Sequence, residues 1–400
     1  MQDVLPSETG VSSPARSSRW FGVGRSALSD SERAGATAAA AAVLGDGAKL
    51  IVVFASPSHD LAALLGGIRG HTRTTPLIGC STAGEIASDG PGDASVVVAA
   101  FGGPGFVVRT SVARGVSTRM RDAGAQVAAV AGEAPNHPHH ALLLLADGLA
   151  GDMTELVRGA YSMLGATTPL VGGCAGDDLS MKRTHQLWEG EVLEDAVVAA
   201  WLASDAPLGI GVQHGWRRVG EPMLVTGSEG NKVLTLDERP ALDVYLELLN
   251  PPAEAHRSPA DFTTFALTHP LGLSRRSGEE VRFLAGADMD ERSLNCIAAV
   301  PSGSLVWVME GDVDSVMVAT DAACREAIEA LGDHTPLGVL AFDCIARRAV
   351  LGDAGIKREI DCIAAHTGAP VAGFYTYGEI ARTHGVNGFH NQTLVVLAVA

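Results

Sequence analysis

Three loops of small and hydroxyl-bearing residues, each ending in an acid, have the chemistry to bind a small molecule. Each loop follows a proline, with a glycine three residues later and an acid nine residues later. The acids are Glu85, Asp178 and Glu379. Backbone N–H groups in such loops can hold a carboxylate, and an acid can hold an ammonium group. The pattern predicts a site for a ligand that carries both groups, such as an amino acid, unless the acids only cap turns or pair with arginines.

The residues expected at this site come from the three loops and from the segment that follows the third. They are Gly79, Cys80, Ser81, Thr82, Glu85, Asp178, Thr376, Tyr377, Glu379, His390 and Asn391. Ser81, Thr82 and Thr376 would add hydroxyl donors to the backbone donors. We expect this site to bind a ligand and not to catalyse a reaction.

Cys80 raises the alternative of a thiol-dependent hydrolase. The run from Gly79 to Ala83 is similar to the strand-to-helix turn that presents a nucleophile, but it ends in alanine where that motif has glycine. No histidine and acid follow in the required order. A buried structural thiol is the interpretation that we favour for Cys80.

The three loops belong to a repeated strand–helix–strand plan. The buried strands are expected at 50–55, 141–146 and 337–342, the helices at 59–69, 151–164 and 353–367, and the later strands at 96–101, 197–202 and 393–397. A further strand is expected at 106–109 in the first copy and at 210–213 in the second. The glycines of the loops are Gly79, Gly172 and Gly373, and each should mark a close approach of two backbones.

The segment between the second and third copies follows a different pattern. It predicts a turn-rich connector at 220–231, a helix at 240–249, strands at 262–268, 281–287, 294–300 and 304–309, and a helix at 315–331. We expect an α/β protein, or a mixed α+β one, with repeated strand–helix–strand units in two domains. The expected divisions are a disordered tail at 1–18 and domains at 19–235 and 236–400.

Composition excludes several classes of protein. The net charge of −17 disfavours binding to nucleic acid, and no apolar run approaches the roughly 18 residues that a membrane helix needs. The six cysteines form no CxxC pair, and the N-terminus lacks a signal-peptide pattern. These features predict a cytoplasmic protein with reduced thiols.

Three segments resemble the FIST family, named for F-box and intracellular signal transduction proteins. They are 231–237, 373–380 and 389–393, and the resemblance extends over about 25–400. It implies a sensory protein for small ligands, including amino acids. Because no F-box, kinase or cyclase segment is present, the resemblance implies a sensor that acts on a separate partner, with a histidine kinase as a candidate. A dimer stays open.

Some bacterial FIST proteins look like haem-binding nitric-oxide sensors, which makes haem the alternative ligand. His384 and His390 lie in the signature region beside aromatic residues and are the candidate axial ligands. The interpretation that we favour is that His390 and Asn391 tie the last strand to a neighbouring loop. No cofactor or metal is otherwise expected.

Overall fold

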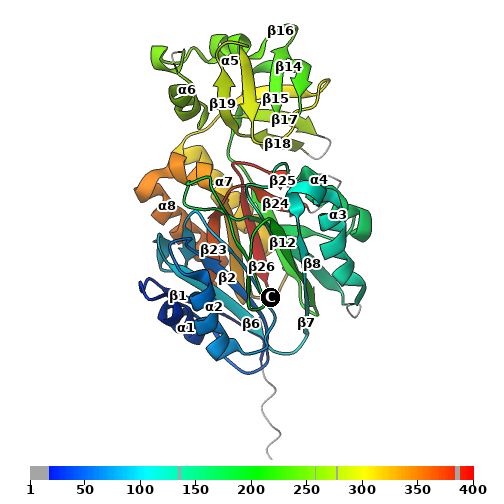
Figure 1. Ribbon diagram of the computed structural model, residues 1–400, viewed down its shortest axis with the longest axis vertical. Coiled ribbons are helices and arrows are strands. Elements are labelled where there is room, and N and C mark those ends of the chain that lie inside the picture. The colour runs from blue at the N-terminus through cyan, green and yellow to red at the C-terminus, as the bar shows by residue number, and fades with distance from the viewer. Residues whose placement is uncertain (1–17, 134–136, 257, 276–277, 383–387) are drawn as a thin grey trace, which may run out of the picture.

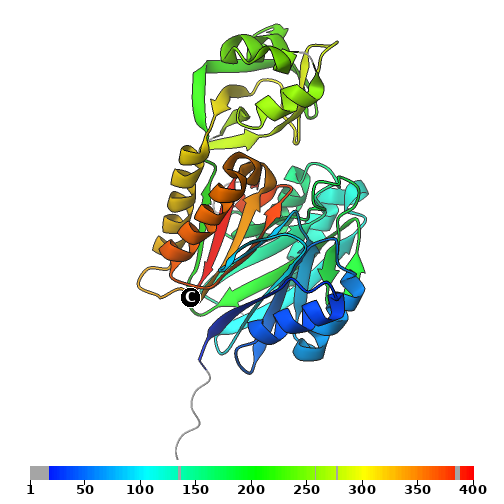
Figure 2. The same cartoon turned by 90° about the vertical axis from the view of Figure 1, so that its left-hand side faces the viewer.

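The computed structural model describes residues 18–133, 137–256, 258–275, 278–382 and 388–400. They form a body of three sheets with helices on the outside, and a smaller domain that stands on one end of the body (Figure 1 and Figure 2). Helix makes up 31% and strand 39% of the described residues, so the expected mixed α/β class is confirmed. Of the expected tail at 1–18, all but Ser18 lies outside the described residues, as does His384.

The body consists of three copies of one unit: strand, helix, strand, helix, strand, hairpin, strand. The first copy contains β1 (Trp20–Ser26), α1 (Ser31–Ala42), β2 (Ala48–Ala55), α2 (Leu61–Thr72), β3 (Leu77–Ser81), β4 (Glu85–Ala87), β5 (Gly90–Gly92) and β6 (Val96–Gly102). The second contains β7 (Phe106–Arg114), α3 (Val116–Ala128), β8 (His139–Ala146), α4 (Thr154–Leu164), β9 (Leu170–Cys174), β10 (Gln186–Trp188), β11 (Glu191–Leu193) and β12 (Ala196–Ser204). The third contains β13 (Leu208–Gln213), α7 (Val313–Glu329), β22 (Gly338–Cys344), α8 (Ile345–Thr367), β23 (Val371–Thr376), β24 (Glu379–Arg382), β25 (Phe389–His390) and β26 (Leu394–Val399).

Each copy completes its sheet with a hairpin from another copy. The strand orders are β1-β6-β2-β3, β7-β12-β8-β9 and β13-β26-β22-β23, and only the last two strands of each set are parallel. Hairpin β10–β11 then extends the first sheet, β24–β25 the second and β4–β5 the third. The exchange closes on itself, so the described strands of the body are one interdependent assembly.

Helices cover the outer face of each sheet in the body, and the neighbouring sheets cover its inner face. The strands are therefore buried on both faces. In β2, successive side chains point to opposite faces of the sheet, as the two-residue repeat of a strand requires. Leu50, Val52 and Phe54 enter the central core, while Ile51 and Val53 pack under α1 and α2. This double burial explains why the strands appear in the sequence as continuous apolar runs.

A small domain interrupts the third copy between β13 and α7. It contains β14 (Arg217–Glu229), β15 (Lys232–Leu236), β16 (Arg239–Pro240), α5 (Ala241–Leu249), α6 (Pro259–Ala266), β17 (Leu271–Arg275), β18 (Gly278–Arg282), β19 (Leu284–Asp288), β20 (Ser293–Cys296) and β21 (Leu305–Glu310). Its strands form a separate antiparallel sheet, ordered β18-β17-β21-β14-β15-β20-β19, with β16 beside β15. Its core is separate as well, built around Tyr245 and Phe262.

Several expectations for individual segments are confirmed and others are wrong. Helices expected at 240–249 and 315–331 appear as α5 and α7, but the strand expected at 262–268 is helix α6. Ser258 accepts a hydrogen bond from the Asp261 N–H, and Pro259 follows this cap, so the local signals favour a helix start there. The connector expected at 220–231 lies mostly within β14, which is 13 residues long.

The strands at 106–109 and 210–213 open the second and third copies, whereas we expected them to close the first and second. The division into 19–235 and 236–400 stays a prediction. The sheets group the residues differently, because β13 pairs with β26 in the third sheet. No helix in the described part of the chain is long and apolar enough to cross a membrane.

Candidate functional site

The glycines of the three loops occupy equivalent positions. Gly79, Gly172 and Gly373 lie opposite Val53, Leu144 and Ala341 in the three parallel strand pairs. A Cβ atom on each glycine would lie 2.5, 1.9 and 2.0 Å, respectively, from the carbonyl oxygen of its opposite residue. The backbones approach too closely for any side chain there, so the repeat inferred from the sequence is a repeat of structure.

The three loops meet one another at the end of the body that carries the small domain. Gly176 N–H donates to Ser81 O at 3.0 Å, which joins the second loop to the first. Cys174 N–H donates to Gly378 O at 2.8 Å, and Ala83 N–H donates to Tyr375 O at 3.1 Å. These bonds close a ring of loops at the carboxyl ends of the parallel strands, the usual position of ligand sites in α/β proteins.

Glu85 and Glu379 brace this ring from inside. Glu85 accepts hydrogen bonds from Thr82 Oγ1 at 2.5 Å and from the N–H of Ser95 at 3.1 Å. Glu379 accepts from the Thr376 hydroxyl and from the N–H of Thr393 at 3.1 Å. Both side chains are fully buried. Burial raises the pKa of Glu85 to about 7 and that of Glu379 to about 8, although the hydrogen bonds oppose the shift.

The counterpart of these two acids in the second copy is Gln186, and the expected equivalence of Asp178 is wrong. Glu85, Gln186 and Glu379 each open a hairpin strand and each pair with the residue after a loop glycine. Gln186 accepts from Ala196 N–H at 3.2 Å and donates to Thr184 Oγ1 at 3.4 Å. The second loop is longer than the others, so counting nine residues from its proline reaches a different place.

The extra residues of the second loop wrap around the carboxylate of Asp177. This carboxylate accepts from Tyr377 Oη at 2.5 Å and from the N–H groups of Met181, Lys182 and Arg183. Burial opposes ionisation of Asp177, but these four donors hold its pKa below the usual value. Tyr377 Oη also accepts from Leu179 N–H at 2.8 Å. The loop is therefore held by specific bonds at the junction with the small domain.

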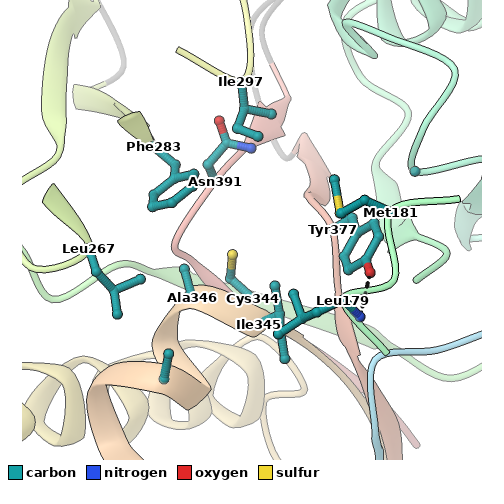
Figure 3. A pocket seen from close by; sticks show the side chains of 12 residues that line it. Leu179, Met181, Leu267, Phe283, Ile297, Cys344, Ile345, Ala346, Tyr377 and Asn391 are labelled. Atoms are coloured by element: carbon teal, nitrogen blue, oxygen red, sulfur yellow. Dashed lines mark hydrogen bonds between the residues drawn. The ribbon is translucent and has the colours of Figure 1, made fainter. Parts of the chain in front are cut away.

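A cavity of about 220 Å³ lies beside this loop, between the small domain and the body (Figure 3). The small domain contributes Leu267, Phe283 and Ile297. The third copy contributes Cys344, Ile345, Ala346, Ala349, Tyr377 and Asn391, and the second copy contributes Gly148, Leu179 and Met181. Most of these side chains are apolar. Leu179 and Met181 are 62% and 56% exposed, so an apolar edge of the cavity faces solvent.

The side-chain amide of Asn391 lies at this cavity, and its oxygen lacks a hydrogen-bond partner among the described residues. Its side chain is 2% exposed, and its Oδ1 makes no hydrogen bond with the described residues. An unpaired amide oxygen in an apolar setting costs about 1–3 kcal/mol. A ligand with a donor group would remove that cost. Figure 3 shows the amide at the cavity, above the sulfur of Cys344 and beside Ile297.

The residues next to Asn391 connect the cavity to the attachment of the small domain. Gln392 Nε2 donates to Leu267 O at 2.7 Å, and its own carbonyl accepts from Trp216 Nε1 at 3.0 Å. Arg347 donates to His214 O at 3.0 Å, where the chain leaves the body. A molecule that contacts Asn391 would thus lie one residue away from the bonds that position the small domain.

The structure divides the expected site residues other than His390 into two groups. Tyr377 and Asn391 line the cavity, and Asp178 lines an adjoining groove of about 490 Å³ with Arg348. The others stay in the interlocked loops: Gly79, Cys80, Ser81, Thr82, Glu85, Thr376 and Glu379 are buried there. Burial, together with the nearby Cys174 and Glu85, raises the pKa of Cys80. A fully buried thiol in the central core does not suit a nucleophile.

Sequence reasoning missed most of the residues that line the cavity. The small domain supplies three of them, and its pairing with the body has no local signal in the sequence. Cys344 could have been noticed, since it ends a buried strand run at the position that Ser56 and Asp147 occupy in the other copies. Residues after such strands commonly form ligand sites in α/β folds.

His390 does not suit the role of an axial haem ligand in the cavity. The Nε2 atom of His390 bonds with Ala381 O at 2.9 Å, and burial lowers the pKa of the ring. His390 is not among the residues that line the cavity. The bond to Ala381 O holds β25 against β24, whereas the favoured interpretation had His390 tie the last strand to a neighbouring loop.

Two FIST domains match the chain, the FIST N domain over 49–239 and the FIST C domain over 241–382. A Mycobacterium tuberculosis protein described as uncharacterized is 28% identical over 387 residues, or 93% of this chain and 97% of the relative. A Methanocaldococcus jannaschii protein, also described as uncharacterized, is 28% identical over 159 residues, or 37% of this chain and 30% of the relative.

Among solved structures, PurLQS from Thermotoga maritima aligns at 14% identity with a TM-score of 0.22, over 95% of this chain and 72% of that one. The two domain matches together account for nearly the whole chain. The protein belongs to the FIST family.

Proposed function

We propose that this protein is a sensor whose small ligand binds in the cavity between the small domain and the body. FIST domains are associated with signal transduction and with sensing of small ligands. The observation that carries the proposal is the apolar cavity at the domain junction, with the buried, unpaired Oδ1 of Asn391 on its wall. Pockets of this kind, apolar with a few placed polar groups, are typical ligand sites.

The ligand is small and largely apolar, and it carries a hydrogen-bond donor for Asn391. An amino acid with an apolar side chain meets these needs through its ammonium group. Glu85 and Glu379 do not recognise it directly in this proposal, because their oxygens already bond within the loops. Their hydrogen bonds stabilise the conformation of the ring of loops instead.

Binding changes the position of the small domain and thereby its contacts with a separate partner protein, for which a histidine kinase is a candidate. The small domain is joined to the body by two chain segments, near His214 and Gly311. Two-segment attachments of this kind act as hinges in other proteins. A ligand shifts such an equilibrium only if it binds one domain position more tightly, and a cavity lined from both sides provides that difference.

The test is a thermal-shift screen of the full chain against amino acids and small apolar amines and alcohols. At one hundred times the dissociation constant, a ligand should stabilise the native state by about 2.7 kcal/mol. Ala349→Phe fills the cavity from an exposed helix position and should abolish the shift.

Ala354→Phe is the matched control, because Ala354 is exposed on the same helix but does not line the cavity. It should respond to the ligand as the wild type does. A ligand that stabilises wild type and Ala349→Phe equally binds elsewhere, and the proposal would then be wrong.

A further inference from the structure

The side chains that line the cavity at the domain junction offer few polar groups to a ligand. None of the described residues that line it carries a charged side chain. The hydroxyl of Tyr377 already donates to Asp177 and accepts from the Leu179 N–H, and the thiol of Cys344 is a weak hydrogen-bonding group. The amide of Asn391 is therefore the side-chain group that is left to recognise a polar part of the ligand.

Asn391 presents an acceptor and a donor side by side on one planar group. Its Oδ1 is buried and lacks a partner among the described residues. No hydrogen bond within the described ranges uses its Nδ2 either. A ligand satisfies both atoms at once when its own N–H and C=O lie next to each other and point the same way.

We propose that the ligand of this cavity is a small apolar primary amide or lactam, which pairs with the amide of Asn391 through two hydrogen bonds. Primary amides and lactams carry an N–H on the same side as the carbonyl oxygen. An open-chain secondary amide is trans, so its N–H and C=O point in opposite directions and only one of them can reach Asn391. The class of ligand named here rests on the proposed function, because the same cavity must admit it.

The size and the walls of the cavity fit an amide with a short hydrocarbon part. An apolar cavity of about 150 Å³ binds benzene, which has six carbon atoms. By that measure a cavity of about 220 Å³ admits roughly eight or nine non-hydrogen atoms. Figure 3 shows Phe283, Leu267 and Ile345 around the same space as Asn391, so the hydrocarbon part would pack against these apolar side chains.

A charged ligand is disfavoured by this lining. Moving an ion from water into an apolar site costs free energy unless an opposite charge pairs with it there. An amino acid can donate to Oδ1 of Asn391, but neither its ammonium group nor its carboxylate would find a charged partner among the described lining residues. Asp177 does not line the cavity, and its carboxylate already accepts from four donors. An uncharged amide should therefore bind more tightly than an amino acid of similar size.

Three isomeric amides of equal size test the pairing on the full chain. Hexanamide has its N–H and C=O on the same side, N-methylpentanamide has them on opposite sides, and N,N-dimethylbutanamide has no N–H. Thermal-shift titrations should show the tightest binding for hexanamide and roughly tenfold weaker binding for N-methylpentanamide. Binding of N,N-dimethylbutanamide should be weaker again. Caprolactam, whose ring holds the N–H beside the C=O, should bind as hexanamide does.

Asn391→Leu tests the residue, because it removes the amide and keeps a side chain of similar size. It should weaken the binding of hexanamide roughly tenfold or more and abolish the preference among the three isomers. Its melting curve reports whether the variant is folded. Ala354→Phe, on the exposed face of α8 and outside the cavity, is the control and should keep the preference.

Norleucine, hexanoate and hexylamine separate this inference from the proposed function. If one of these charged compounds binds more tightly than hexanamide, and Ala349→Phe abolishes that binding, the amide class is wrong and the cavity remains a ligand site. Equal binding of the three isomers, or binding of hexanamide that Asn391→Leu leaves unchanged, would also overturn the inference. If no amide and no charged compound binds, the result counts against the cavity as well.

Discussion

Replacing Glu85 with glutamine should make the protein less sensitive to rising pH. Glu85 is fully buried, and burial raises its pKa from 4.5 to about 7. Between pH 4.5 and pH 7 the folded chain therefore keeps a proton that the unfolded chain has released. Each pH unit in that window lowers the free energy of unfolding by about 1.36 kcal/mol. Over this window the loss from Glu85 amounts to about 3 kcal/mol, and Glu85→Gln removes it.

The second copy shows that glutamine is compatible with this position. Gln186 accepts from the Ala196 N–H as Glu85 accepts from the Ser95 N–H, and it donates to Thr184 Oγ1, whereas Glu85 accepts from Thr82 Oγ1. Glu85→Gln should therefore retain the fold. Relative to wild type, it should gain about 3 kcal/mol on going from pH 4.5 to pH 7.

Urea unfolding at several pH values measures this gain directly. The control is Glu32→Gln, since Glu32 is exposed at the start of α1. If Glu85→Gln and wild type lose stability with pH in parallel, then Glu85 ionises as readily in the folded chain as in the unfolded chain. The view that the acid is held protonated in the ring of loops would be refuted.

Four further substitutions test other parts of the structure. Gly373→Ala should destabilise the chain by roughly 1–3 kcal/mol or more, because its Cβ would lie 2.0 Å from Ala341 O. Gly66→Ala, in open space on helix α2, should instead stabilise it by up to about 1 kcal/mol, and urea unfolding of both variants checks the pair. Arg347→Met leaves two buried carboxylates without their cation and should cost about 3–5 kcal/mol in the same assay. Tyr377→Phe removes the hydroxyl that bonds Asp177, so amide hydrogen exchange at 178–183 should become faster, while exchange in the distant α1 should not change.

The repeat could be recognised in the sequence because its signals are local. Continuous apolar runs such as Leu142–Leu145 require burial on both faces, and each loop glycine is needed where two backbones meet. The strand–helix–strand order of each copy followed from these signals, but the strands at 106–109 and 210–213 were assigned to the preceding copy. The exchange of hairpins could not be foreseen, because strands as short as β4 or β10 carry no periodicity of their own.

The candidate site was foreseen in part. Tyr377 and Asn391 were expected and do line the cavity, because the third loop leads directly to the domain junction. Glu85 and Glu379 were expected to face a ligand, but their partners turn them inward. The sequence does not distinguish an acid that binds a ligand from one that braces a loop. Phe283 could not be identified at all, since only the folded arrangement brings the small domain over the body.

The position of a bound ligand is the most direct test of the account. A crystal structure of the full chain with the strongest compound from the thermal-shift screen would provide it. We predict that the ligand lies between Phe283 and Tyr377 and bonds to the amide of Asn391. A ligand bound at the carboxyl groups of Glu85 or Glu379, with the cavity at the domain junction unfilled, would contradict the account.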